Sequence, residues 1–193
     1  MRERQIRKLY PELPAFAALD RKLKRAYRYR NSFAIARKFH GTPCYGETPL
    51  PILKNIAKRC GLKKEDHLFE LGAGRGRGAF FINSLTGCQV TAVEIVPTFV
   101  EIGKELAPSS VNFIQEDFLD CDFSEATCIY LSGTMLTRDT IRRLCKKLQN
   151  SKAKIISVSY PLKAYDSRFT TLSSWEEKFP WGKTKLYLQK SST

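Results

Sequence analysis

The sequence predicts an α/β fold built on a seven-stranded, mostly parallel sheet. Short apolar runs alternate with longer amphipathic segments between residues 50 and 160, which is typical of strands alternating with helices. A glycine-rich stretch follows the first run, where a parallel sheet commonly turns into a helix. Two strand-like runs close the chain without a helix between them, so we expect an antiparallel closing strand. Strands that alternate with helices give a parallel sheet covered on both faces.

The first 40 residues predict two or three short, basic amphipathic helices. Apolar side chains recur among the charges at roughly helical spacing, at Leu9, Leu13, Phe16, Leu19, Leu23, Tyr27, Phe33 and Ile35. A loop with Gly41, Pro43, Gly46 and Pro49 follows. We therefore divide the chain into a basic helical N-terminal extension, residues 1–44, and a domain that carries the sheet, residues 45–193.

The remaining elements follow in chain order. The predicted strands are His67 to Leu71, Gln89 to Ile95, Val111 to Gln115, Thr127 to Leu131, Lys154 to Tyr160, Arg168 to Leu172 and Lys185 to Gln189. The predicted helices are Leu50 to Cys60, a helix from the glycine-rich turn to Leu85, Thr98 to Leu106, and Arg138 to Leu148.

Composition limits the classes of protein. With 42% apolar and 27% charged residues the chain is typical of a globular protein, and no apolar run is long enough for a membrane span. We expect a soluble, cytoplasmic protein. The six cysteines form no C-x-x-C pair and only two histidines accompany them, which predicts reduced, mostly buried thiols and no metal site. The net charge is +14, and residues 1–40 contribute +9. This segment is expected either to contact nucleic acid or an acidic surface, or to form a solvated helical cap over the sheet.

The turn that runs from Glu70 to Gly78 predicts a nucleotide-sized ligand. Its sequence is Glu-Leu-Gly-Ala-Gly-Arg-Gly-Arg-Gly, and we expect Gly72, Ala73, Gly74 and Gly76 to bring backbone close to that ligand. Gly74, Gly76 and Ala79 also fit the G-x-G-x-x-A form of the dinucleotide fingerprint. The two arginines of the turn, Arg75 and Arg77, are expected either in solvent or facing an anionic substrate.

Acidic and aromatic residues after the strands favour S-adenosylmethionine as the cofactor, with S-adenosylhomocysteine as product. Glu70 ends the first strand, where a carboxylate attracts an ammonium group and repels a pyrophosphate. Glu94, beside Ile95 at the end of the second strand, is placed to accept both ribose hydroxyls. Asp117 and Phe118 follow the third strand and supply a carboxylate for the adenine amino group and a ring for its face.

The order of these motifs resembles one family in particular. Tyr45-Gly46-Glu47-Thr48 precedes a helix, then come Leu68 to Gly76, Val93-Glu94 and Glu116 to Leu119. This arrangement resembles the non-SET histone-lysine methyltransferases, of the disruptor-of-telomeric-silencing type, and their smaller prokaryotic protein-lysine methyltransferase relatives. The resemblance covers roughly residues 44 to 136. It implies a Rossmann-like class I methyltransferase that methylates lysine side chains of a protein.

The resemblance also implies roles for individual residues. Glu47 and Thr48 would lie on a loop folded over the methionine end of the cofactor, and Tyr45 would line the methyl-transfer channel together with Ser132 and Thr134. Met135, Tyr160 and Trp181 are further candidates for the channel. Ser132 takes the position of a functionally important asparagine of the family, and a hydroxyl does not reproduce the carbonyl and two donors of an amide.

Other functions stay open at this point. The net charge permits an RNA or DNA methyltransferase, although no Asn/Asp-Pro-Pro-aromatic tetrad follows the fourth strand. A methyltransferase acting on a small molecule or phospholipid is a second alternative. A cofactor-binding module without catalysis, working through its basic arm, is a third.

Overall fold

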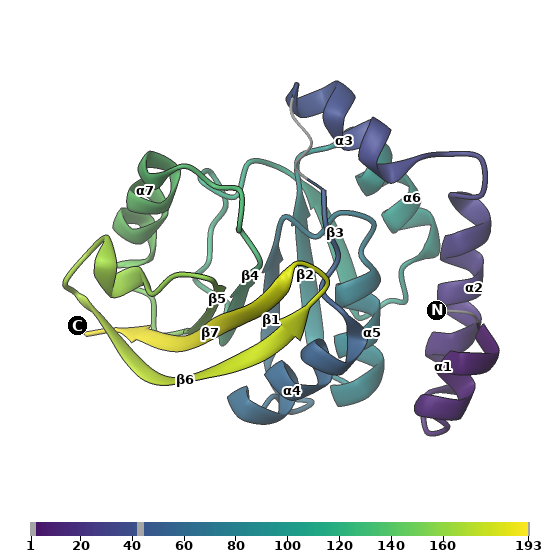
Figure 1. The fold of residues 1–193 in the computed structure, drawn as a ribbon, viewed down its shortest axis with the longest axis horizontal. Coiled ribbons are helices and arrows are strands. Elements are labelled where there is room, and N and C mark those ends of the chain that lie inside the picture. Colours follow the sequence, from purple (N-terminus) through teal and green to yellow (C-terminus); the bar gives the residue numbers. More distant parts are fainter. Residues whose placement is uncertain (1–2, 42–44, 193) are drawn as a thin grey trace.

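A computed structural model describes residues 3–41 and 45–192. It has the predicted fold class, a seven-stranded sheet in the order β3-β2-β1-β4-β5-β7-β6 (Figure 1). The strands are β1 (His67–Leu71), β2 (Gln89–Glu94), β3 (Val111–Gln115), β4 (Cys128–Leu131), β5 (Lys154–Val158), β6 (Phe169–Phe179) and β7 (Gly182–Ser191). The first five are parallel, and β7 joins β5 in the antiparallel sense.

The last two strands are much longer than their sequence pattern predicted. They pair along their whole length as an antiparallel hairpin, with one irregularity between Thr171 and Ser173. The side chains of β6 do not alternate strictly between buried and exposed, so no clear period of two marks the outer part of the strand. Leu186 of β7 pairs with Val158, the last residue of β5. The part of the hairpin between β6 and β7 that precedes Leu186 therefore extends beyond the end of β5.

The helices are α1 (Glu3–Leu9), α2 (Pro14–Ala26), α3 (Ser32–His40), α4 (Leu50–Cys60), α5 (Arg77–Thr86), α6 (Pro97–Leu106) and α7 (Arg138–Leu148), with a short 3-10 helix, η1 (Leu162–Ala164). Alternate strand residues bury against opposite helical layers. Leu68, Ala92 and Tyr130 belong to one core with α4, α5 and α6. Phe69 and Leu131 belong to a second core with α7.

The N-terminal helices are packed onto the sheet domain. Ile6 of α1, Phe16 of α2 and Ala36 of α3 lie in the same buried cluster as residues of β1, β2 and β3. The rings of Phe16 and Phe81 of α5 are 5.1 Å apart and nearly perpendicular. In Figure 1, α1 and α2 stand beside α5 and α6, and α3 lies above them. The domain boundary at residue 44 stays a prediction, since residues 42–44 lie outside the described part of the chain.

Two further expectations bear on the described residues. No helix within residues 3–41 and 45–192 is long and apolar enough to cross a membrane. The five cysteines that the structure describes are all buried, as predicted, and Cys44 lies outside the described residues.

Candidate functional site

The glycine-rich turn joins the end of β1 to the start of α5. The turn is tied to the neighbouring strand because the backbone N–H groups of Gly72 and Ala73 both donate to the carbonyl of Val93, over 2.9 and 3.0 Å. Gly76 has a φ of +76°, and a Cβ at this position would lie 2.1 Å from the ring of Phe113. Only glycine fits both the conformation and the contact.

Glu94, at the end of β2, holds the turn from the other side. One carboxylate oxygen accepts the N–H of Gly74 over 2.7 Å, and the other accepts the N–H of Val96 over 2.9 Å. The side chain is buried, and Ile95 beside it is half-buried. A carboxylate has about four acceptor positions, so two remain for a ligand after these bonds.

Glu70 ends β1 under the same turn. The pKa of Glu70 is raised to about 8, mainly by burial; a hydrogen bond from the Ala79 N–H opposes this shift, and the charges of Glu47 and Glu94 add to it. Its Oε2 atom is buried and has no hydrogen-bond partner among the described residues. A buried carboxylate oxygen without a partner is unfavourable unless a donor or cation reaches it.

Asp117 and Phe118 lie beyond the end of β3, and both are half-buried. One oxygen of Asp117 accepts the N–H of Leu119 over 2.9 Å, which shapes the turn that follows the strand. The ring of Phe118 packs against the core on the α7 side of the sheet.

The loop of residues 45–49 crosses the glycine-rich turn and is clamped to it by Arg75. The Tyr45 hydroxyl donates to Glu47 Oε1 over 2.7 Å, and Arg75 donates to both residues, with Nε 3.0 Å from the tyrosine oxygen and 2.8 Å from the carboxylate. The ring of Tyr45 lies against Gly74, where a Cβ would be 3.1 Å from Cε2, and it also packs beside Phe33. Burial raises the pKa of Tyr45, so the hydroxyl stays protonated.

The expectation that the two arginines of the turn lie in solvent was wrong. Arg75 binds Glu47, and Arg77 donates from Nε to the carboxylate of Asp20 on α2 over 2.6 Å. The side chains of Arg75 and Arg77 are only 17% and 13% exposed. Sequence reasoning missed Asp20 because it lies among basic residues 57 positions before its partner.

Thr48 reaches the opposite wall of the site. Its hydroxyl lies 2.5 Å from the hydroxyl of Tyr130 on β4. Tyr130 is fully buried and faces the same side of the sheet as its register partner Glu70. Burial raises the pKa of Tyr130. Sequence reasoning missed this residue as well, although a tyrosine inside a short aliphatic strand is the kind of signal that marks it.

The predicted channel residues are not all brought together. Thr134 and Met135 are exposed beyond the end of β4. Tyr160 lies next to this loop and its hydroxyl donates to the Gly133 carbonyl over 3.5 Å. Trp181, at the tip of the β6–β7 hairpin, is exposed and stacks on Phe179 with ring centroids 4.6 Å apart.

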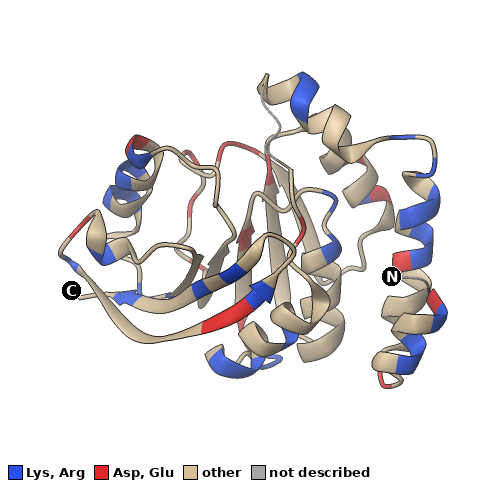
Figure 2. Ribbon diagram, viewed as in Figure 1, with Lys and Arg blue, Asp and Glu red and all other residues tan. Residues whose placement is uncertain are grey.

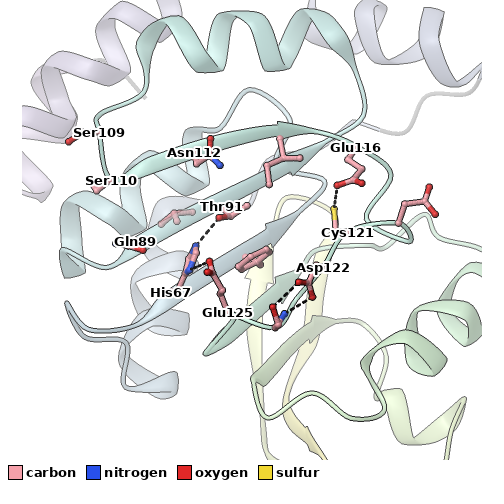
Figure 3. Close-up of a pocket in the computed structure, with 15 residues that line it drawn as sticks. His67, Gln89, Thr91, Ser109, Ser110, Asn112, Glu116, Cys121, Asp122 and Glu125 are labelled. Atoms are coloured by element: carbon pink, nitrogen blue, oxygen red, sulfur yellow. Dashed lines mark hydrogen bonds and ion pairs between the residues drawn. The ribbon is translucent and has the colours of Figure 1, made fainter.

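A pocket of about 700 Å³ lies away from the glycine-rich turn, along β1, β2 and β3 (Figure 3). It is on the same face of the sheet as α7, which covers the neighbouring strands. The residues between β3 and β4, all of them described, form no helix, which leaves this strip of the sheet open. Its 15 lining residues include Glu116, Asp120, Asp122 and Glu125 but no Lys or Arg, and none of the predicted site residues. No group of three or more His, Cys, Asp or Glu within residues 3–41 and 45–192 could hold a metal ion.

Comparison with solved structures reveals the same fold in several methyltransferases. An RNA methyltransferase from Salinibacter ruber, solved with S-adenosyl-L-homocysteine, is 21% identical with a TM-score of 0.61, over 76% of this chain and 93% of that one. The B. subtilis tRNA methyltransferase TrmK is 13% identical with a TM-score of 0.58, over 72% and 64%. A mutant form of MtNAS, solved with S-adenosylmethionine, is also similar, at 18% identity with a TM-score of 0.63, over 99% and 78%.

Comparison at the level of sequence families is more specific. No curated protein sequence matches the chain significantly. The family model of the histone methylation protein DOT1 matches residues 36–174, which include the loop of residues 45–49, the glycine-rich turn, Glu94, Asp117, Phe118 and the end of β4. The chain therefore belongs to the DOT1 histone methylation family and has the fold of a class I S-adenosylmethionine-dependent methyltransferase.

Proposed function

We propose that this protein transfers a methyl group from S-adenosylmethionine to lysine side chains of a protein. Membership of the DOT1 family supports the reaction class. The observation that carries the proposal is the contact between Thr48 and Tyr130, because it joins the loop over the glycine-rich turn to the end of β4, where Ser132 lies. Cofactor and acceptor residues thereby meet at the carboxyl ends of β1 and β4, where ligands of open α/β sheets bind.

The residues at the turn fit the cofactor. The buried, unpartnered Oε2 of Glu70 fits the ammonium of the methionine end. Glu94, with both oxygens already fixed by backbone N–H groups, would accept the ribose hydroxyls. Asp117 and Phe118 would hold the adenine, and Gly72, Ala73, Gly74, Gly76 and Ile95 would shape the surface that it lies on. When bound, the cofactor supplies an electrophilic methyl group on a sulfonium.

The protein's own contribution to transfer is positioning and exclusion of water. Thr48, which is hydrogen-bonded to the Tyr130 hydroxyl, and Ser132, two residues after Tyr130, would orient the acceptor amine, and Thr134 would border its entrance. Glu47 and Tyr45 would act indirectly, since Arg75 fixes both against the turn. A lysine must release its proton to water before it attacks, and removal of the amine from water on entering the site lowers its pKa.

The test is transfer of labelled methyl from S-adenosylmethionine into fractionated protein, RNA, DNA and lipid. We expect label in protein lysines, lost in Glu94→Gln and strongly reduced in Tyr130→Phe. Glu101→Gln, on the exposed side of α6, is the matched control and should transfer normally. Calorimetric titration with S-adenosylmethionine should show lost binding for Glu94→Gln and retained binding for Tyr130→Phe.

A second candidate, methylation of nucleic acid, is favoured by the exposed basic residues beside the site. Label in RNA or DNA but not in protein would replace the lysine proposal with this one. Label in lipid or in no fraction, with normal cofactor binding, would point to a lipid, a small molecule or a non-catalytic role. Absence of cofactor binding in the folded wild-type protein would refute the whole assignment.

A further inference from the structure

The outer side of α2, the turn after it and α3 form one strongly basic segment. Residues 21–40 contain eight Lys or Arg and no Asp or Glu. Six of these cations are exposed and form no ion pair with any residue in the described ranges: Lys22, Arg25, Arg28, Arg30, Arg37 and Lys38. Figure 2 shows Lys and Arg along the outer side of α2 and in the turn that leads to α3.

Exposed aromatic rings are interleaved with these cations. Tyr29 is 88% exposed, Phe33 is 58% exposed and Phe39 is 46% exposed. The guanidinium of Arg28 lies over the Tyr29 ring, 5.3 Å from its centroid. Rings on a solvated surface lose the stabilisation of burial, so three of them among exposed cations indicate a surface that something covers.

One of these rings, Phe33, is anchored to the rest of the fold. The Asn31 side chain caps α3 by accepting the N–H of Phe33 over 3.0 Å, and Ala36 buries the inner side of the helix. The ring of Phe33 lies 5.2 Å from that of Tyr45, which rests on Gly74 of the glycine-rich turn. The basic segment therefore borders the candidate site.

We propose that residues 21–40 bind a single-stranded nucleic acid and lead it to the rim of the glycine-rich turn. Lys and Arg side chains pair with the phosphates, and exposed rings stack on unpaired bases. A duplex hides the faces of its bases, and an acidic protein surface offers nothing for the rings to stack on. RNA and DNA strands both offer phosphates and unpaired bases, so either could bind this surface. Such binding does not depend on which acceptor is methylated.

The test is fluorescence anisotropy of the full-length protein with a labelled strand of about 12 nucleotides, within the usual site size of such surfaces. The strand is supplied as RNA, as DNA and as a DNA duplex, each over a range of salt concentrations. We expect both single strands to bind more tightly than the duplex. The difference in affinity between the RNA strand and the DNA strand shows which of the two the surface prefers.

Two kinds of variant separate the stacking from the charge. Tyr29→Ala should weaken single-strand binding by roughly fivefold to a hundredfold at every salt concentration, because one stacked base is lost. Arg28→Gln/Arg30→Gln should instead reduce the slope of log affinity against log salt by about 1.4, from two lost phosphate contacts. Arg142→Gln/Arg143→Gln, exposed on α7, removes the same charge and should leave the slope unchanged.

Two outcomes would overturn the proposal. Equal affinity for duplex and single strand, with no effect of Tyr29→Ala, would mean that the cations attract phosphates of any nucleic acid and that the rings do not stack on bases. Failure of every nucleic acid to bind at low salt would leave an acidic protein surface as the partner. Circular dichroism of each variant should match that of the wild type, since the substituted side chains are exposed.

Discussion

Glu70 lies in an environment that disfavours the charged form of its side chain. Its carboxyl is buried under the glycine-rich turn and receives the Ala79 N–H, but one oxygen has no partner in the described residues. The folded protein therefore favours the neutral acid when no cation is bound. A ligand with an ammonium group would relieve this cost and favour the ionised form.

Glu70→Gln should make folding less sensitive to pH. The folded pKa of about 8 lies above the ordinary value of 4.5, so the wild type loses stability from this group as pH rises through that interval. The loss is of the order of 1.4 kcal/mol per pH unit. Urea unfolding without cofactor should show that the free energy of unfolding of the variant rises relative to that of the wild type as the pH increases from 4.5 to about 8. A stability difference that does not change with pH would contradict the burial of an unpaired carboxyl.

Gly76→Ala should destabilise the protein more than the same change at Gly72. Both glycines have positive φ, which costs an alanine about 1–2 kcal/mol. Only at Gly76 would the new Cβ meet the ring of Phe113, whereas the site at Gly72 is open. Overpacking adds roughly 1–3 kcal/mol, so urea unfolding should separate the two variants by that amount. Equal losses would mean that the ring moves aside without cost.

Helix α2 contributes to the candidate site through Asp20, a residue with a fully buried side chain. The carboxylate binds Arg77 at the start of α5 and also Lys24, one turn further along α2. Arg77 in turn has Nη1 4.0 Å from Glu47 Oε2 in the loop over the turn. The N-terminal helices, the glycine-rich turn and the loop are therefore joined by one chain of ionic contacts.

Asp20→Asn should cost far more than removal of Glu3, a partly exposed acid of α1. Loss of Asp20 leaves Arg77 with the more distant Glu47, 4.0 Å away, and removal of one partner from a buried ion pair costs about 3–5 kcal/mol. Glu3→Gln breaks contacts of Glu3 to Arg7 and Arg21, whose side chains are more than half exposed, and should cost at most about 1 kcal/mol. Urea unfolding of both variants measures the difference. A loss of below about 1 kcal/mol for Asp20→Asn would show that water or another group replaces the carboxylate.

The described chain has two cores, one on each side of the sheet, and the N-terminal helices belong to the larger one. Ile6, Phe16 and Leu23 are as deeply buried there as Leu68 of β1. Helices that share a core with the central strands lose their packing when those strands unfold. The basic segment and the sheet should therefore behave as one cooperative unit.

Urea unfolding should accordingly give a single transition. Helical circular dichroism and tryptophan fluorescence should change with the same midpoint. Trp175 of β6 is buried, and the guanidinium of Arg59 on α4 lies over its ring. Hydrogen exchange should report similar opening free energies for α2 and β1. Separate midpoints, or early exchange of α2 alone, would support an independent extension that ends near residue 44.

The sequence by itself determined the features that depend on local pattern. Apolar runs alternating with amphipathic segments set the parallel sheet, and the glycines after β1 set the turn, because each signal lies within a few neighbouring residues. The positions of Glu70 and Glu94 followed from the ends of their strands. The order of the motifs from Tyr45 to Phe118 was sufficient to identify the family, which the family model confirms.

Only the tertiary structure decided which side chains meet across the fold. Arg77 and Asp20 are 57 residues apart, and Thr48 and Tyr130 are 82 apart, so no local spacing relates them. The pairing removed both arginines of the turn from the solvent and made Tyr130 part of the candidate site. The full length of the β6–β7 hairpin likewise came from pairing between strands, since β6 lacks the alternation that would have marked it. Periodicity reports which face of an element is buried, whereas the partner on that face is chosen by packing of the whole chain.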